Sequence, residues 1–310
     1  MLKGKDLLSI HDLTVEEVDE ILTFAAELKA MQKMGIEHKI LSGKTLGMIF
    51  EKSSTRTRVS FEVGMYQLGG SALFLSNRDL QLGRGEPIKD TARVLSRYLD
   101  GIMIRTYGHE RVIELAKYAD IPIINGLTDL LHPCQVLTDL LTIKEHKGKN
   151  LKNLKMAYVG DGNNMTNSYM YGAAKVGMTL AVATPSNYKP NAEVFNGALA
   201  DSTETGAKII WTEDPVEAVR DADIIATDTW ASMGQEAEHD ERKKIFVPYQ
   251  VNKELLSHAN KNAIVMHCLP AYRDEEITEE IFEENANVIF DEAENRLHVQ
   301  KAIMALTMTD

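Results

Sequence analysis

A run of hydroxyl and guanidinium side chains follows a short apolar segment in the first third of the chain. The segment TLGMIF (residues 45–50) leads into EKSSTRTR, in which Ser54 to Thr57 precede a predicted helix over residues 59–68. Free N–H groups at a helix start, the helix dipole and an arginine together favour phosphate binding. The run lacks the glycines of a Walker loop, so a nucleoside triphosphatase is not indicated. A capped helix with solvated arginines explains the same residues equally well.

Two more apolar segments of this half lead to polar side chains. DGIMIR ends at Arg105, and IPIIN leads to His132-Pro133-Cys134-Gln135. Because a buried arginine needs a partner, we expect a substrate anion or a buried carboxylate beside Arg105. Taken alone, His132 is better interpreted as a capping or hydrogen-bonded histidine, and Cys134 as a packing residue.

The second half repeats this pattern with different side chains. KMAYVGD continues into Gly162-Asn163-Asn164, an incomplete G-x-G-x-x-G fingerprint that suits a polar ligand better than a pyrophosphate. ADIIATD ends at Asp228, and the long polar loop after it contains Ser232-Met233-Gly234. A loop of this length is typical of a lid or of a disordered insertion.

Two further positions complete the set of candidate residues. AIVMHCLP carries His267 and Cys268, and Arg296 begins a predicted last helix over residues 295–308. An anion pocket together with a carboxylate-containing pocket, on facing domains, indicates a transferase with two substrates. No Ser-His-Asp order, H-E-x-x-H motif or paired Cys/His spacing indicates a hydrolytic triad or a metal site.

Length and composition limit the class of protein. The 310 residues predict about two domains, and a net charge of −12 argues against broad contact with nucleic acid or anionic membranes. Two cysteines are too few for a disulfide framework. The N-terminal segment has no signal-peptide pattern, and no apolar run reaches the roughly 20 residues that span a bilayer. We therefore expect a soluble, cytoplasmic protein.

The elements that must hold these residues are short apolar segments alternating with amphipathic ones. Thr14 and Glu17 predict a capping box before a first helix. Strands are expected at TLGMIF, SALFL, DGIMIR and IPIIN, and after the polar segment KGKNLKN at KMAYVGD, TLAVATP, AKIIWTED, ADIIATD, AIVMHCLP and NVIFDEA. Uniformly apolar strands alternating with helices predict an α/β protein with two doubly wound, mainly parallel domains, whose ligands bind at the carboxyl ends of the strands.

At these motifs the chain resembles the aspartate/ornithine carbamoyltransferase family from end to end. Ser54-Thr55-Arg56-Thr57 is similar to the carbamoyl phosphate signature of the whole family. His132-Pro133-Cys134-Gln135, Asp228 with Ser232-Met233-Gly234, His267-Cys268-Leu269-Pro270 and Asn295-Arg296-Leu297-His298 resemble the ornithine-specific members. The resemblance implies carbamoyl transfer from carbamoyl phosphate to the δ-amine of L-ornithine, giving L-citrulline and phosphate, without a metal or organic cofactor.

The resemblance also implies an architecture and an assembly. It predicts a carbamoyl phosphate-binding domain over residues 1–148 and an ornithine-binding domain over 149–310, with the helix at 295–308 returning to the first domain. It further predicts a homotrimer or an assembly of trimers, with active sites at subunit interfaces.

Roles for single residues follow from the same resemblance. The carbamoyl phosphate-binding residues would be Ser54, Thr55, Arg56, Thr57, Arg105, His132, Gln135, Cys268, Leu269 and Arg296, together with Gln81, which reaches across the trimer interface. The ornithine-binding residues would be Asn164, Asp228, Ser232 and Met233. Arg105, His132, Asp228 and Cys268 would be catalytic, although Cys268 as a small pocket-lining residue is the alternative.

Other functions stay open at this point. The same chemistry on putrescine, an acylated ornithine or aspartate is the nearest alternative. A nicotinamide-dependent dehydrogenase would use the doubly wound fold and VGDGNN, but the incomplete fingerprint argues against it. A third alternative is a regulatory member of the same family that binds ligands without catalysis.

Overall fold

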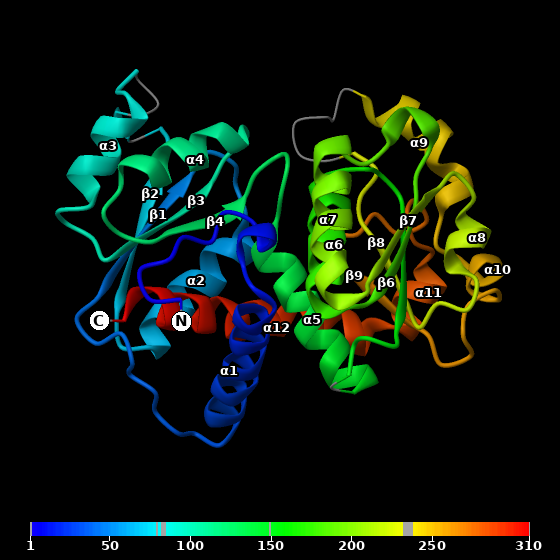
Figure 1. Ribbon diagram of the computed structural model, residues 1–310, viewed down its shortest axis with the longest axis horizontal. Coiled ribbons are helices and arrows are strands. Elements are labelled where there is room, and N and C mark those ends of the chain that lie inside the picture. The colour runs from blue at the N-terminus through cyan, green and yellow to red at the C-terminus, as the bar shows by residue number, and fades with distance from the viewer. Residues whose placement is uncertain (1, 79, 82–84, 149, 232–237, 310) are drawn as a thin grey trace. The chain divides into compact units, whose positions relative to one another are not determined.

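Two compact units make up the protein (Figure 1). The computed structural model describes residues 2–78, 80–81, 85–148, 150–231 and 238–309. Unit 1 comprises Met1–Leu141 and Asn295–Asp310, and unit 2 comprises Thr142–Glu294. Each unit is built on one parallel sheet with flanking helices, as the sequence predicts.

The elements of unit 1 alternate along the chain between helix and strand. They are η1 (Ile10–Asp12), α1 (Val15–Lys33), β1 (Thr45–Phe50), α2 (Thr55–Gln67), β2 (Ser71–Ser76), α3 (Ile88–Leu95), β3 (Gly101–Arg105), α4 (His109–Tyr118), β4 (Ile123–Leu127) and α5 (Pro133–Lys147), the last continuing into unit 2. The predicted capping box is confirmed, because Thr14 accepts from the Glu17 backbone while the Glu17 side chain accepts from the Thr14 backbone.

Unit 2 repeats the alternation of helix and strand. Its elements are β5 (Lys155–Val159), α6 (Asn164–Val176), β6 (Thr179–Ala183), η3 (Ser186–Tyr188), α7 (Ala192–Thr205), β7 (Lys208–Thr212), α8 (Pro215–Val219), β8 (Ile224–Thr227), α9 (His239–Phe246), η5 (Val247–Tyr249), α10 (Lys253–Leu256), β9 (Ile264–His267), α11 (Glu279–Glu284) and α12 (Ala286–Met308), which enters unit 1 at Asn295.

The strand order of each sheet reverses once, and this decides where polar side chains can gather. The orders are β2-β1-β3-β4 and β7-β6-β5-β8-β9, with every pair parallel. The chain leaves β1 and β3 toward opposite sides of the first sheet, and β5 and β8 toward opposite sides of the second. Ligands of such sheets bind in the crevice at the carboxyl ends of these two strands.

One predicted strand is wrong. Residues 287–293 (NVIFDEA) form the beginning of α12 instead of a strand. Ile289 and Glu292 are fully buried whereas Phe290 is 56% exposed, which is the spacing of a helix face. A short apolar run does not distinguish a strand from a buried helix segment by its periodicity, and here the helix extends without a break to Met308.

The C-terminal half of α12 packs against α1 and α2 of unit 1, as the sequence predicts (Figure 1). At Gly64 of α2 an added Cβ would lie 2.9 Å from the Met304 side chain and 3.3 Å from that of Lys301. The absence of a side chain at Gly64 therefore lets the two helices approach closely. Lys29 of α1 donates to Asn295 Oδ1 at 2.7 Å and fixes the start of this segment.

Lys301 of α12 is a fully buried lysine that joins three other segments of unit 1. Its ammonium group donates to Gln32 Oε1 and Gln67 Oε1, each at 2.9 Å, and lies 3.1 Å from His38 Nε2. His38 Nδ1 lies 2.9 Å from the Ile36 carbonyl and so carries the ring proton, which leaves Nε2 to accept. These partners are neutral, and burial lowers the pKa of Lys301 to about 8.

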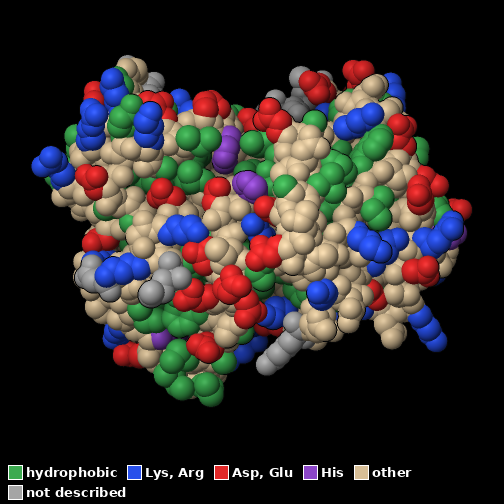
Figure 2. All heavy atoms as spheres, in the orientation of Figure 1, with side chains coloured by type: hydrophobic (Ala, Val, Ile, Leu, Met, Phe, Trp, Pro, Cys, Tyr) green, Lys and Arg blue, Asp and Glu red, His purple; other side chains and the backbone are tan. Residues whose placement is uncertain are grey.

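The charge of the surface and the hydropathy of the helices limit the class of protein. Acidic side chains are spread over both units on the face that Figure 2 shows, in keeping with the net charge of −12. Within the described ranges, no helix is both long and apolar enough to cross a membrane.

Replacing Lys301 with methionine is expected to change how stability depends on pH. The folded-state pKa of about 8 lies below the value of about 10.4 for an unfolded lysine, so the unfolded chain binds more protons between these limits. Wild-type stability should therefore rise relative to Lys301→Met over this window, by at most about 1.4 kcal/mol per pH unit. Urea unfolding of both proteins from pH 7 to 10 measures this. The exposed Lys261→Met is the control, and a Lys301→Met difference that stays constant with pH contradicts the assignment.

Candidate functional site

The first turn of α2 presents hydroxyl groups at the carboxyl end of β1. Ser54 is the N-cap residue, and its Oγ accepts from the Thr57 backbone N–H at 3.2 Å. The Ser54 hydroxyl donates to Thr57 Oγ1 at 3.0 Å, and Arg296 donates to the same atom at 3.2 Å. Since Thr57 Oγ1 accepts from both, its own proton is oriented away from them. The helix start and these hydroxyls are the features from which the sequence analysis predicts anion binding.

Arg296 reaches this helix start from α12. It is 4% exposed, and its Nη1 donates to Gln135 Oε1 of α5 at 2.6 Å. Gln135 in turn donates to Asp139 Oδ1 at 2.7 Å, so that its amide orientation is fixed. The structure thus brings together Thr57, Gln135 and Arg296, which the sequence places as much as 239 positions apart.

His132 lies where the electric fields of three arginines overlap. Burial, followed by the charges of Arg296, Arg105 and Arg56, holds the pKa of His132 well below its usual range. The imidazole is therefore neutral at physiological pH, and positive charge at this place comes from the guanidinium groups. Arg105 is 7% exposed at the end of β3, where it pairs in register with Phe50 at the end of β1. The arginine cluster, as we call residues 54–57, Arg105, His132, Gln135 and Arg296, lies at the strand reversal of sheet one.

Cys134 has the packing role predicted from the sequence. Its thiol is fully buried and donates to the Asn125 carbonyl at 3.4 Å. Burial raises its pKa to about 12, which keeps the sulfur protonated and unreactive.

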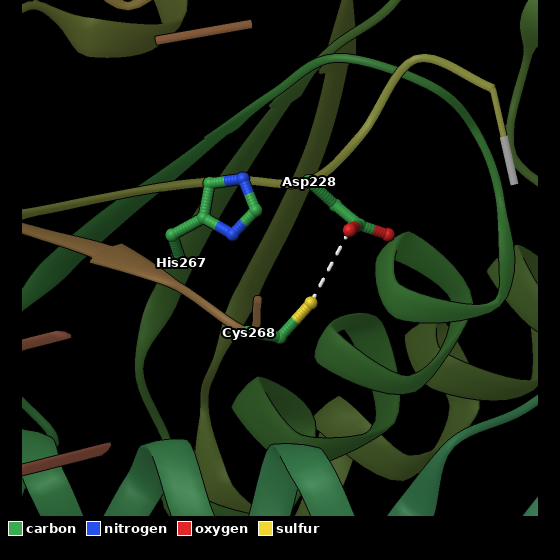
Figure 3. A group of neighbouring side chains, drawn as sticks. All are labelled: Asp228, His267 and Cys268. Carbon is green, nitrogen blue, oxygen red and sulfur yellow. Dashed lines mark hydrogen bonds between the residues drawn. The ribbon is translucent and has the colours of Figure 1, made fainter. Parts of the chain in front are cut away.

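In unit 2, Asp228 is the centre of a hydrogen-bond network at the carboxyl end of β8 (Figure 3). Its Oδ1 accepts from the Thr229 backbone N–H at 2.8 Å and from the Cys268 thiol at 3.2 Å. Its Oδ2 accepts from Asn163 Nδ2 at 2.9 Å. Asn163 is also the N-cap residue of α6, where its Oδ1 accepts from the backbone of Met165 and Thr166. Asp228 is thus held at the strand reversal of sheet two.

His267 supports the turn that carries Cys268. The Leu269 backbone N–H donates to His267 Nδ1 at 2.9 Å, so the ring proton is on Nε2, which donates to Glu276 Oε1 at 2.9 Å. Both side chains of this pair are buried, and Glu276 Oε1 also accepts from the Tyr272 backbone. Leu269 has φ of 59°, a left-handed conformation that non-glycine residues seldom adopt. The hydrogen bond to His267 stabilises that conformation, and the conformation sets the direction of the backbone after Cys268.

Asp228, His267 and Cys268 have ligand atoms within 4.8 Å of one another, a donor set that zinc binds. Both ring nitrogens of His267 already have protein partners, and the thiol donates to Asp228. The three side chains are therefore satisfied as a hydrogen-bond network.

A buried ion pair borders this network. Arg242 of α9 pairs with Asp161, which follows β5, and its Nε donates to the Trp230 carbonyl at 2.5 Å. Burial raises the pKa of Asp161 to about 7, with the charge of Arg242 opposing the shift and that of Asp228 adding to it. Asp161 and Arg242 thereby fix the chain just after β8.

For the remaining residues predicted from the sequence, the structure gives a position in the fold and a degree of burial. Asn164 begins α6 and Leu269 follows Cys268, and both are partly buried. Gln81 lies between β2 and α3 with an exposed side chain. Ser232 and Met233 lie outside the described residues.

The sequence analysis noted Asn163 only as part of a polar turn, without its bond to Asp228, and it did not identify Glu276, the partner of His267. Asn163 was detectable, because asparagine after Gly160-Asp161-Gly162 is a typical helix cap. Glu276 had no local signal, since only the fold brings it to His267.

Family models cover nearly the whole chain. The carbamoyl-P binding domain of aspartate/ornithine carbamoyltransferase matches residues 5–145, and the Asp/Orn binding domain of the same family matches residues 152–307. The chain belongs to the aspartate/ornithine carbamoyltransferase family. The resemblance drawn from the sequence motifs is confirmed.

Individual members of the family are similar over their full lengths. The ornithine carbamoyltransferase of Carboxydothermus hydrogenoformans is 62% identical over 306 residues, which are 99% of this chain and 98% of the relative. The solved structure of the Pyrococcus furiosus ornithine carbamoyltransferase superposes with a TM-score of 0.96 at 55% identity, covering 99% of this chain and 98% of that one. The anabolic enzyme of Campylobacter jejuni gives a TM-score of 0.91 at 47% identity, with 97% of each chain covered.

Proposed function

We propose that this protein transfers the carbamoyl group of carbamoyl phosphate to the δ-amine of L-ornithine, giving L-citrulline and phosphate. The observation that carries the proposal is the convergence of Arg56, Arg105 and Arg296 on a neutral His132, beside the hydroxyls of α2. Family membership supports the reaction, and the family models support unit 1 as the carbamoyl phosphate-binding domain and unit 2 as the ornithine-binding domain.

The arginine cluster suits both ends of carbamoyl phosphate. Ser54, Thr55, Arg56 and Thr57 would bind the phosphate with N–H and O–H donors, together with the charge of Arg105. Arg105, His132 and Gln135, with Thr57, would hold the carbamoyl end, and Arg296 would complete the cluster. Gln81 of a neighbouring subunit would add one more donor. A donor aimed at the carbonyl oxygen is worth about 3 kcal/mol as negative charge develops there.

The Asp228 network suits the amine. A carboxylate fixed by Asn163, Thr229 and Cys268 would bind an ammonium group of ornithine, while Asn164, Ser232 and Met233 would bind the amino-acid head group. Asp228 and Cys268 would orient the δ-amine, which must lose one proton to become a nucleophile. Cys268 and Leu269 would lie where the two substrates meet.

The proposed step conserves atoms and electrons. The lone pair of the deprotonated δ-amine forms a bond to the carbonyl carbon, and the carbonyl oxygen gains negative charge. The C=O bond then re-forms as the bond between the carbon and the bridging oxygen breaks, and the bridging oxygen leaves with the electron pair as part of phosphate. The second amine proton then passes to the departing phosphate, which the arginines stabilise. No electron donor or acceptor is required.

We also propose that the protein is a homotrimer, or an assembly of trimers, in the cytoplasm. Apolar side chains on α2 and on β2, the edge strand of its sheet, are exposed in a single chain; they are Val59, Val63, Tyr66, Leu73 and Phe74. Exposed apolar area of this kind commonly marks a subunit interface. Gln81 follows the same strand. Use in arginine biosynthesis is supported by relatives that are named anabolic.

A direct assay tests the reaction and its second substrate together. Purified protein is incubated with carbamoyl phosphate and one amine in each of four parallel reactions; the amines are L-ornithine, putrescine, N-acetylornithine and L-aspartate, and the carbamoylated products are quantified. We expect fast formation of citrulline from ornithine. The other three amines should be carbamoylated far more slowly. Turnover with a different amine would retain the arginine cluster as the carbamoyl phosphate site and overturn the ornithine assignment. No turnover with any amine would contradict the proposed reaction.

Asn163→Ala tests the role of the Asp228 network. Asn163 and Asn191 are N-cap residues of neighbouring helices in unit 2, but Asn163 also donates to Asp228. Each alanine variant should lose about 1 kcal/mol of stability. Only Asn163→Ala should lower kcat/KM for ornithine, by about tenfold, because a hydrogen bond to a charged group is worth about 1.5–3 kcal/mol. Equal kcat/KM for ornithine in the two variants would show that the Asn163–Asp228 bond is irrelevant to the reaction.

A further inference from the structure

Gln300 makes contacts with Arg296 that no sequence motif indicated. It lies on α12 four residues after Arg296, which puts the two side chains on one helix face, and it is fully buried. The orientation of its amide is assigned from its neighbours: with the oxygen facing Arg296, that oxygen accepts from Nη2 at 2.9 Å and from Nε at 3.1 Å, and the nitrogen donates to Ser60 Oγ at 2.5 Å. One amide therefore links the guanidinium group to helix α2.

Ser60 continues the connection to the phosphate-binding turn. Its hydroxyl donates to the backbone carbonyls of Arg56 at 2.6 Å and Thr57 at 3.2 Å. Arg56 and Thr57 belong to the arginine cluster. A hydrogen-bonded path thus runs from Arg296 through Gln300 and Ser60 to the first turn of α2, and it sets the guanidinium group at a fixed position relative to that turn.

The chemistry of the acceptors around Arg296 is as important as their geometry. Gln135 Oε1, Thr57 Oγ1 and Gln300 Oε1 are all uncharged oxygens. A buried arginine needs hydrogen-bond partners for its N–H groups. A carboxylate in the place of Gln300 would supply such partners but would cancel the guanidinium charge in a low-dielectric environment. An amide supplies an acceptor for these donors without adding a negative charge beside the guanidinium group.

We propose that Gln300 is a positioning residue for carbamoyl phosphate binding, because it aligns Arg296 with the first turn of α2 through an amide that brings no negative charge of its own. This inference rests on the proposed function, since it assumes that Arg296 binds the phosphate end of that substrate. Gln300 itself acts through Arg296 and Ser60.

Two substitutions separate positioning from charge. Gln300→Met keeps the length and much of the volume of the side chain but removes all three hydrogen bonds. Gln300→Glu keeps an acceptor for Arg296 and adds a negative charge. The matched control is Gln67→Met, which removes the Gln67 Oε1 acceptor from Lys301, the next residue of α12, and leaves Arg296 untouched.

The measurements are kcat, KM for each substrate, the inhibition constant of inorganic phosphate, and the thermal unfolding midpoint. Gln300→Met should raise KM for carbamoyl phosphate and the phosphate inhibition constant about tenfold, or about 1.4 kcal/mol. Gln300→Glu should raise both further, although it retains more of the wild-type thermal stability than Gln300→Met. KM for ornithine at saturating carbamoyl phosphate should stay unchanged in both variants, and Gln67→Met should alter stability alone.

A pH series gives a readout that a purely structural role would not change. As the pH falls, the carboxylate introduced by Gln300→Glu gains a proton and becomes neutral, so the deficit of this variant in phosphate affinity relative to wild type should shrink. Gln300→Met should show no such recovery.

Three outcomes would overturn either the positioning role of Gln300 or the proposed reaction. If both Gln300 variants bind phosphate as wild type does, or if Gln67→Met weakens phosphate binding equally, the positioning role is wrong. Should Gln300→Met fail to fold, Gln300→Glu alone decides through its pH profile. Wild-type protein that forms no citrulline would instead overturn the proposed function itself.

Discussion

Holding several buried guanidinium groups close to one another is the constraint on which the rest of this structure depends. Arg105 and Arg296 are buried, and burial of a guanidinium group is costly unless its N–H groups have partners. The partners of Arg296 include a threonine hydroxyl and two glutamine amides, which carry no charge. His132 could have added a further charge, but its burial and the arginines keep it neutral. We propose that the charge of this cluster serves to bind a dianion.

Strand order explains why the functional residues lie where they do. In each sheet the strand order reverses beside the first strand, between β1 and β3 in unit 1 and between β5 and β8 in unit 2. Ser54 to Thr57 follow β1 and Arg105 ends β3, while Asn163 follows β5 and Asp228 follows β8. The same kind of strand reversal therefore positions the arginine cluster in one unit and the Asp228 network in the other.

Much of this arrangement could be predicted from the sequence because its signals are local. TLGMIF is strand β1 with the predicted bounds, and the Thr14–Glu17 capping box begins α1. Residues at strand ends, such as Arg105 and Asp228, stand out because a polar side chain interrupts an apolar run. The prediction at residues 287–293 was wrong because the periodicity of a short apolar segment is ambiguous, and only the long continuation of α12 resolves it.

The residues that could not be predicted are those whose partners are distant in the sequence. Gln300 matters through Arg296 and Ser60, and Ser60 lies 240 positions before it (300 − 60). Glu276 orients His267 from a loop with no pattern of its own. Both side chains are ordinary polar residues in the sequence, and only the fold shows what they hold in place. The residues that support a site are for this reason harder to recognise than the residues that form it.

Calorimetric titration of inorganic phosphate into the protein tests the central claim most directly, because phosphate probes the cationic cluster without requiring turnover. The account predicts that the wild-type protein binds phosphate and that Arg105→Gln and Arg296→Gln each lower the affinity at least tenfold, or about 1.4 kcal/mol. Wild-type protein that fails to bind phosphate, or arginine variants that bind it as tightly as wild type, would contradict the account.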